Sequence, residues 1–172
     1  AITPNTKLFI LNSPSNPTGS VYSADEIKAL GDVCVEKGVL IMSDDIYEKL
    51  LYDGAEFTSV TGFSGEHKAH TIIVHGLAKA YSMTGWRIGY AAGPEKLIGA
   101  MRKVQSQSTS NPCTVSQWAA VEALNGTQDY IAENNKMFTR RRNLVVDMLS
   151  EIDGIVCPKP EGAFYVYPSI AG

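Results

Sequence analysis

The sequence predicts an α/β fold with a largely parallel β-sheet that is covered by helices on both faces. Several apolar runs of four or five residues do not alternate with polar residues, which is typical of strands buried on both faces. The first two runs are separated by a helical segment, and strand–helix–strand order favours parallel strands. Hydrophobic residues make up 44% of the 172 residues and charged residues 19%, so the chain is globular rather than disordered.

The first strand and the first helix have clear local signals. Residues 7–11 are an apolar run that ends in a loop rich in Asn, Ser and Pro, and this pattern predicts a buried strand. Ser23 and Glu26 have the spacing of a capping box, in which each side chain accepts a hydrogen bond from the other residue's backbone N–H. Apolar residues follow at helical spacing, and Gly38 is placed to end this helix.

The other elements follow in order along the chain. Further strands are predicted at residues 39–42, 71–74 and 86–92, and helices at residues 94–103, 115–124 and 129–151. Because no helix separates the third and fourth strands, the fourth can run in the opposite direction. Two short strands at residues 155–157 and 163–167 are predicted to begin a second unit. The basic triplet at residues 140–142 is interpreted as a solvated helix face rather than an anion site.

Charge and composition exclude several classes of partner. Lys and Arg number 15 against 18 Asp and Glu, so the net charge of −3 gives no basic surface for nucleic acid or an anionic membrane. The longest apolar runs are too short to span a bilayer, and the first residues do not resemble a signal peptide. Three widely spaced cysteines are an odd number, which favours reduced thiols and a cytoplasmic location.

Polar side chains follow three of the predicted strands. In an open α/β sheet, ligands bind beyond the carboxyl ends of the strands. The first strand is followed by residues 12–19, the second by residues 43–47, and the third by residues 75–79 and the segment up to Arg87. These ends present an amide, a carboxylate with a phenol, and a lysine with an arginine. We expect them to converge on one small polar ligand.

This set of side chains matches the chemistry of pyridoxal phosphate. The amine of Lys79 can form a Schiff base with an aldehyde, an arginine can bind phosphate with two hydrogen bonds, and a carboxylate can pair with a protonated ring nitrogen. A phenol and an amide can both hydrogen-bond the 3-oxygen of this cofactor. Taken singly, a lysine or an aspartate at a strand end is more often a surface residue.

Four segments together resemble one known family. Asn16–Gly19 (NPTG), Ser43–Tyr47 (SDDIY), Ala78–Tyr90 (AKAYSMTGWRIGY) and Pro160–Tyr165 (PEGAFY) are similar to motifs of the class I/II pyridoxal-phosphate aminotransferases of fold type I. The resemblance is closest to the bacterial aspartate aminotransferase subgroup. The NPTG turn alone is weak evidence, whereas the block from the lysine to the arginine is specific. The resemblance covers nearly all of this chain and less than half of a typical family member.

The resemblance implies a role for each matching residue. Lys79 forms the Schiff base with the cofactor and moves the proton during catalysis, and Asp44 keeps the pyridine nitrogen protonated. Tyr47 and Asn16 hydrogen-bond the 3-oxygen, and the Asn16 amide also lies beside the substrate carboxylate. Arg87 binds the cofactor phosphate. The catalytic residues are therefore expected to be Lys79, Asp44 and Tyr47.

Some residues near these motifs are given other interpretations. Ala78 stands where many relatives have Ser, and His75 stands where many have Asn; we interpret His75 as structural rather than as an acid–base group. Trp86 and Tyr90 are expected to pack in the core. A metal site at residues 44–45 is disfavoured, because consecutive strand-end side chains point apart and no third ligand accompanies them.

The resemblance also implies a domain organisation. Residues 1–128 are expected to be part of the three-layer αβα cofactor-binding large domain, residues 129–152 a long connecting helix, and residues 153–172 the start of a small α+β domain. The chain does not begin with Met and matches less than half of a typical member, so we expect a piece of a longer protein with little activity alone. Residues 106–112 resemble a stretch that approaches the neighbouring subunit, which implies a homodimer.

The implied activity is transamination between an L-amino acid, with aspartate as the first candidate, and a 2-oxo acid such as 2-oxoglutarate. One alternative is another reaction on the same fold and cofactor, by an aromatic or alanine aminotransferase or a carbon–sulfur lyase. A second alternative is a protein without catalytic activity that keeps the fold as a scaffold. Retention of Lys79, Asp44, Tyr47 and Arg87 together argues against the scaffold.

Overall fold

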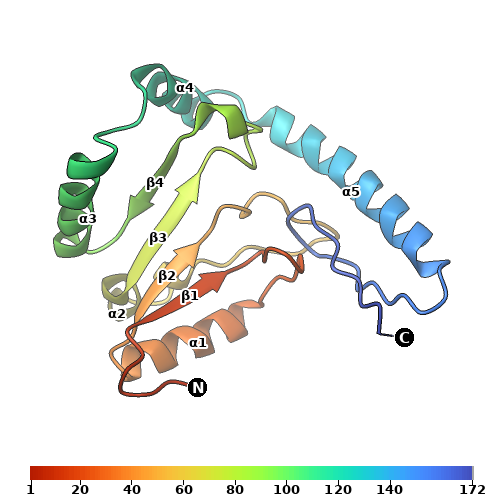
Figure 1. Cartoon of the computed structure of the whole chain (residues 1–172), viewed down its shortest axis with the longest axis horizontal. Coiled ribbons are helices and arrows are strands. Elements are labelled where there is room, and N and C mark those ends of the chain that lie inside the picture. Colours follow the sequence, from red (N-terminus) through yellow and green to blue (C-terminus); the bar gives the residue numbers. More distant parts are fainter. Residues whose placement is uncertain (172) are drawn as a thin grey trace.

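Four strands form a single sheet in the computed structural model, which describes residues 1–171 (Figure 1). The strands are β1 (Leu8–Asn12), β2 (Leu40–Asp44), β3 (Thr71–Gly76) and β4 (Gly89–Ala92), in the order β1-β2-β3-β4. The first three are parallel, and β4 runs antiparallel to β3. Asn12 pairs with Asp44, which in turn pairs with Val74, so three carboxyl ends meet at one edge. The predicted mixed α/β class with a mostly parallel sheet is confirmed.

The helices lie close to the predicted ranges. They are α1 (Ala24–Glu36), α2 (Gly65–His70), α3 (Glu95–Ser108), α4 (Thr114–Asn125) and α5 (Asp129–Ser150). The capping box is present: the backbone N–H of Ser23 donates to Glu26 Oε2 at 2.8 Å, and the backbone N–H of Glu26 donates to Ser23 Oγ at 3.3 Å. The short helix α2 was not predicted. Within the described range, no helix combines the length and the apolar character needed to cross a membrane.

The main core lies between one face of the sheet, helix α1 and the short helix Val60–Gly62. It consists of Leu11, Ile27, Cys34, Val39, Ile41 and Val60. Side chains alternate between the two faces of a strand, so Leu8 and Ile10 point away from this core. They are 45% and 59% exposed. Residues 1–171 therefore do not cover both faces of β1 as the sequence predicted.

A second apolar cluster holds the loop that follows β3. Leu77, Ala80 and Tyr81 of this loop pack with Ala120 of α4 and Ile131 of α5. In Figure 1 the start of α5 lies near this loop, and the helix then extends past the ends of the strands. Because Lys79 lies between the packed residues, its backbone is fixed by the cluster.

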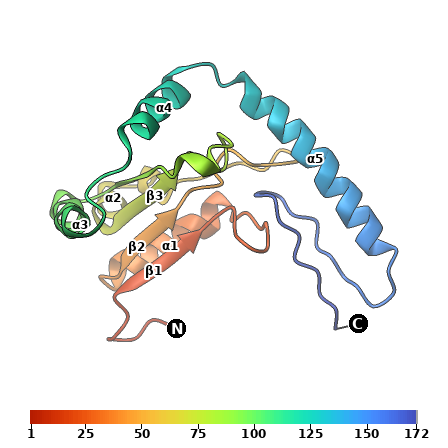
Figure 2. The same ribbon diagram turned by 45° about the horizontal axis from the view of Figure 1, so that its top comes forward.

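The segment after α5 is not a pair of strands, so the strands predicted at residues 155–157 and 163–167 are wrong. It passes beside the loop that follows β1 (Figure 2). The backbone N–H of Gly162 donates to Gly19 O at 2.9 Å, and that of Ala163 donates to Leu50 O at 2.9 Å. These backbone groups pair with two separate loops instead of a neighbouring strand, and Ala163 adopts a left-handed conformation with φ of 56°.

The structure differs from the sequence-based interpretation at three further side chains, Arg142, Trp86 and Tyr90. Arg142, in the basic triplet, is buried, whereas its two neighbours in the triplet are exposed. Its guanidinium donates to Pro160 O at 2.9 Å and lies 2.9 Å from Asp53 Oδ2. The solvated-face interpretation is therefore wrong for this arginine. Trp86 and Tyr90 are each 44% exposed, so neither is a core residue in this chain.

Candidate functional site

A cavity of about 440 Å³ lies at the edge of the sheet where the carboxyl ends of β1, β2 and β3 meet. Its lining consists of Asn12, Asn16, Asp44, Ile46, Tyr47, Val74, His75, Lys79 and Tyr165. Four of the five site residues predicted from the sequence are in this lining, and Arg87 is not. The parallel strands thus bring an amide, a carboxylate, a phenol and an amine together from segments that are far apart in the chain.

Asn12 fixes the loop that carries Asn16. Its Nδ2 donates to the backbone oxygen of Asp44 at 3.1 Å, which ties the end of β1 to the end of β2. Its Oδ1 accepts a hydrogen bond from the backbone N–H of Asn16 at 2.7 Å. Asn12 was not among the site residues predicted from the sequence. The available signal was its position as the first polar residue after the apolar run.

The two consecutive carboxylates of Asp44 and Asp45 point in different directions, as expected for neighbours at a strand end. Asp44 lines the cavity. Asp45 is buried and accepts a hydrogen bond from Ser43 Oγ at 2.6 Å, and its burial raises the pKa of this carboxyl above the ordinary value of 3.8. Within residues 1–171, no three His, Cys, Asp or Glu side chains are grouped to hold a metal ion.

Tyr47 is buried at the cavity wall and its hydroxyl lies 2.6 Å from the hydroxyl of Tyr165. Burial raises the pKa of Tyr47, and the hydrogen bond with Tyr165 and the nearby Asp44 act in the same direction. The phenol therefore stays protonated at neutral pH. A protonated hydroxyl can donate one hydrogen bond while it accepts another.

Lys79 points its amine toward aromatic rings. Its Nζ lies 5.8 Å from the ring centroid of Tyr47 and 5.2 Å from that of Phe164. Cation–π attraction operates at this range and holds an ammonium group without a carboxylate partner. The Lys79 amine is thus oriented into a cavity that also contains the Asp44 side chain.

Arg87 lies outside the described lining of the cavity. It is exposed, its backbone has φ of 48°, and its Nη1 donates to the backbone oxygen of Thr84 at 3.0 Å. The left-handed conformation makes a sharp turn between the short helix Thr84–Trp86 and β4. Its role in phosphate binding stays a prediction.

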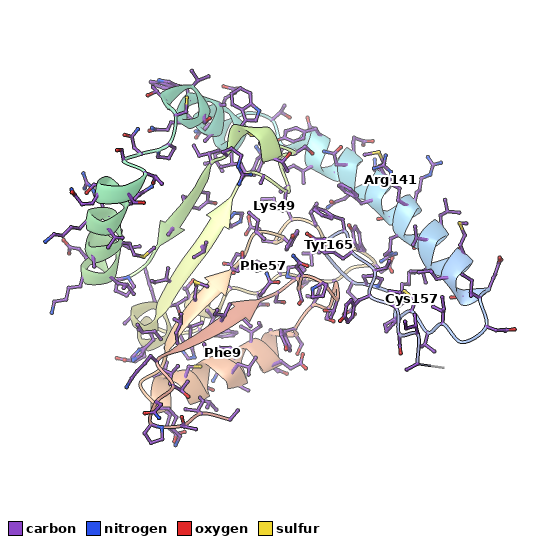
Figure 3. The ribbon with its side chains drawn as sticks, viewed as in Figure 1. Phe9, Lys49, Phe57, Arg141, Cys157 and Tyr165 are labelled. Carbon is purple, nitrogen blue, oxygen red and sulfur yellow. The ribbon has the colours of Figure 1, made fainter. Side chains whose placement is uncertain are left out.

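Phe164 and Tyr165 are site residues that the sequence analysis did not assign. They come from the segment after α5, and Tyr165 lies beside the loops at the carboxyl ends of the strands (Figure 3). The ring of Tyr47 contacts both of them edge-on, with centroids 5.5 and 5.7 Å apart. Strand-end reasoning could not find them because they follow no strand of the sheet. Their presence in the quoted PEGAFY motif was the available signal.

Comparisons with known proteins agree with this arrangement. The model of the family "Aminotransferase class I and II" matches residues 1–172. The aspartate aminotransferase of Geobacillus stearothermophilus is 53% identical over 169 residues, which is 98% of this chain and 43% of that protein. The aspartate/prephenate aminotransferase of Cereibacter sphaeroides is 56% identical over 173 residues, with coverage of 100% and 43%.

Solved structures give the same result for the fold. The crystal structure of the Rhizobium meliloti aspartate aminotransferase superimposes with a TM-score of 0.96 at 50% identity, covering 99% of this chain and 43% of that one. The Thermus thermophilus enzyme with maleate gives a TM-score of 0.91 at 44% identity, with coverage of 98% and 44%. This chain thus spans less than half the length of these relatives. From the family match over its full length, the chain belongs to the class I and II aminotransferases.

Proposed function

We propose that the protein containing this chain is a pyridoxal-phosphate-dependent aminotransferase that moves an amino group between aspartate and a 2-oxo acid such as 2-oxoglutarate. Members of the class I and II family generally use pyridoxal phosphate. The observation that carries the proposal is the convergence of Lys79, Asp44, Tyr47 and Asn16 on one cavity. A primary amine can form the Schiff base with this cofactor and a carboxylate can pair with its ring nitrogen, while a phenol and an amide can hydrogen-bond its 3-oxygen.

The residues of the cavity fit the groups of the cofactor. Asp44 is the carboxylate available for the ring nitrogen, because Asp45 is occupied by Ser43. The protonated hydroxyl of Tyr47 and the amide of Asn16 are the donors available for the 3-oxygen. We assign Arg87 to the phosphate as a proposal that rests on the sequence resemblance; its side chain is exposed and donates to Thr84 O.

Pyridoxal phosphate, when bound, supplies an aldehyde that condenses with amines and a ring that withdraws electrons from the substrate Cα. With the cofactor bound, Lys79 would hold it through its amine and would carry the proton that leaves the substrate Cα. Asp44 would keep the ring nitrogen protonated and so would support that electron withdrawal. Tyr47 orients the 3-oxygen, and Asn16 is placed to bind the substrate carboxylate as well.

The relatives support aspartate as the substrate, since several are named for aspartate. Other names also occur among relatives of this chain. A Streptococcus mutans relative that is 48% identical is named an asparagine–oxo-acid transaminase, and a Pyrococcus horikoshii structure at 38% identity is named an aromatic aminotransferase. A different amino acid on the same cofactor is therefore the alternative that the comparisons favour over a scaffold without activity.

We also propose a cellular location, an oligomeric state and the partners of the protein. The three thiols, none of them in a disulfide within the described residues, support the cytoplasmic location expected from the sequence. A homodimer is supported by the exposed apolar side chains of α3 and α4, such as Val104 and Trp118, each 71% exposed. We expect small amino acids and 2-oxo acids as partners, rather than nucleic acid or a membrane.

The test uses the full-length protein. After incubation with pyridoxal phosphate we expect a long-wavelength absorbance band. Borohydride should bleach this band by reducing the Schiff base, and the reduced cofactor should then be found attached to Lys79. Aspartate and 2-oxoglutarate should each drive one half-reaction, whereas an aromatic amino acid should react more slowly. A colourless protein that takes up no cofactor would refute the proposal. A coloured protein that releases ammonia or sulfide instead of transferring nitrogen would support the lyase alternative.

A further inference from the structure

His75 at the end of β3 forms a buried contact that the proposed chemistry does not use. Its side chain is 6% exposed, and its Nε2 lies 3.1 Å from Oε1 of Glu48. Glu48 follows directly after Tyr47 in the turn beyond β2, and Lys79 is four residues beyond His75 in the loop after β3. The contact therefore joins the two turns that carry these two site residues.

The other ring nitrogen of His75 also has partners. Nδ1 lies 2.7 Å from the backbone N–H of Gly76 and 3.1 Å from the backbone oxygen of the same residue. A neutral ring with its proton on Nε2 accepts from the Gly76 N–H at Nδ1, while Nε2 faces Glu48 Oε1 without meeting the geometry of a hydrogen bond. A protonated ring places its positive charge beside the Glu48 carboxylate, so the contact is an ion pair. The ring also stacks on Tyr90 of β4, with centroids 5.2 Å apart and planes 3° from parallel.

Several titratable groups surround His75. The turn after β2 contributes Asp45 and Glu48, whose Oε1 also lies 3.5 Å from Lys49 Nζ. The β3 loop and β4 contribute Tyr81 and Tyr90, and burial raises the pKa of both phenols. Those two hydroxyls are thus neutral near pH 7.

Among these groups, Glu48 has the strongest favourable effect on the charge of His75. Burial of the imidazole is the largest effect and acts against protonation, but the Glu48 carboxylate, the Gly76 backbone and Asp45 together outweigh it and raise the pKa of His75 above 6.5. The contact with His75 in turn lowers the pKa of Glu48 below 4.5. Both groups are therefore charged together over a wide range around pH 6.

We propose that His75 and Glu48 form a positioning pair that holds the turn carrying Tyr47 against the strand end leading to Lys79. The inference deepens the proposed function, and its cofactor-binding arm rests on that function. Apart from this pair, a hydrogen bond from the Asp45 N–H to Val74 O, at 3.0 Å, joins the same two segments. The pair adds a side-chain tie at the point where the two turns diverge from the sheet.

The sign of the pH dependence follows from the two pKa shifts. The contribution of His75 is complete below about pH 6.5 and is lost as the pH rises through its raised pKa. The contribution of Glu48 is complete above about pH 4.5 and is lost as the pH falls through its lowered pKa. The pair therefore stabilises the fold most between these two values and progressively less in alkaline solution.

The first experiment compares melting temperatures of the full-length apoprotein. His75→Asn keeps a hydrogen-bonding amide but cannot be protonated, and we expect it to lower the Tm by about 1–2 °C at pH 6 and by less at pH 9. Glu48→Gln should lower the Tm with the same dependence on pH. The double variant should lower the Tm by less than the sum of the two single variants. His70→Asn is the matched control, because His70 is half-buried at the end of α2 and its ring nitrogen lies 2.9 Å from Glu66 O rather than near a carboxylate. The proposed pair would be overturned if His75→Asn lowered the Tm equally at pH 6 and pH 9. It would also be overturned if the losses of Tm in the two single variants added up in the double variant.

The second experiment measures binding of pyridoxal phosphate to the same full-length variants by the absorbance of the bound cofactor. We expect His75→Asn to weaken binding roughly 3–10-fold at pH 6, and by less at pH 9, because Tyr47 and Lys79 are then held less firmly. An unchanged affinity would overturn the positioning role. If the unmodified protein binds no cofactor, the proposed function fails, while the melting comparison still decides whether the pair exists.

Discussion

The cavity has two walls that are built in different ways. The first wall is the edge of the sheet, where hydrogen bonds between parallel strands fix Asn12, Asp44 and the end of β3 in register. The second wall is the segment of residues 160–165, which is held by pairs of backbone hydrogen bonds to two loops, at Gly19 and at residues 50–52, and by close packing. The first wall carries most of the reactive groups, and the second covers them with aromatic rings. Substitutions in the first wall should therefore affect chemistry, and those in the second should affect shape and affinity.

The largest effect is expected in the first wall, for Asp44→Asn. The substitution preserves volume but removes the charge that would keep the ring nitrogen protonated. In the full-length enzyme we expect turnover to fall by about 10²–10⁴-fold while the cofactor remains bound. Stopped-flow measurement of the half-reaction with aspartate provides the test, with Asp25→Asn on the surface of α1 as control. Normal turnover would mean that Asp44 does not serve the ring.

Arg87→Ala tests how far the first wall extends. A charged hydrogen bond to phosphate contributes about 1.5–3 kcal/mol, so the dissociation constant of the cofactor should rise roughly 10–100-fold with a smaller change in turnover at saturation. Equilibrium dialysis of the full-length protein measures it. Arg140→Ala, at an exposed position on α5, serves as control. Affinity equal to that of the unmodified protein would leave Arg87 as a turn residue only.

Gly162→Ala tests the packing of the second wall. A Cβ at this position would lie 2.6 Å from Pro14 Cβ and 3.0 Å from the backbone oxygen of Leu50. We expect a loss of about 1–3 kcal/mol in the free energy of unfolding, because neither neighbour can move easily. Urea denaturation of the full-length protein measures it. At Gly99, within α3, a Cβ has open space, so Gly99→Ala should be neutral or slightly stabilising.

The smallest effect is expected for Tyr165→Phe, which removes one hydroxyl from the second wall. Tyr47 would lose the partner at 2.6 Å but keep its edge-on ring contacts. A neutral hydrogen bond contributes about 1 kcal/mol, so cofactor affinity should fall roughly fivefold at most. Tyr167→Phe is the control, since Tyr167 is 61% exposed. If Tyr165→Phe lowered turnover as much as Asp44→Asn does, the second wall would affect the chemistry as well as the shape and affinity of the cavity.

The sequence predicted the first wall well because its signals are local. The capping box at Ser23, the apolar runs and the polar residues after them each depend on neighbouring residues, and parallel pairing then brings the strand ends together. Strand-end reasoning gave the segments that carry Asn16, Asp44, Tyr47 and Lys79, and the family resemblance picked out the individual residues, which do line one cavity. Their individual roles stay predictions.

The second wall was not predicted because its structure depends on contacts between distant residues. Residues 163–167 look like a strand, yet the N–H of Ala163 bonds to Leu50, more than a hundred positions earlier. Arg142 lies within a basic triplet, and its contacts with Asp53, Tyr52 and Pro160 distinguish it from its neighbours. Strand periodicity and charge runs contain no information about such partners.

Helix α5 connects both walls, and this sets a requirement on its length. Near its start, Ile131 packs with the loop of Lys79, and farther along Arg142 holds Pro160, at the beginning of the segment with Tyr165. Eleven residues of α-helix separate these anchors by about 16 Å and three turns. Adding or deleting one residue between them would rotate one anchor by about 100° relative to the other. Evolution of this stretch is thus free to change side chains on the outer surface but not the number of residues.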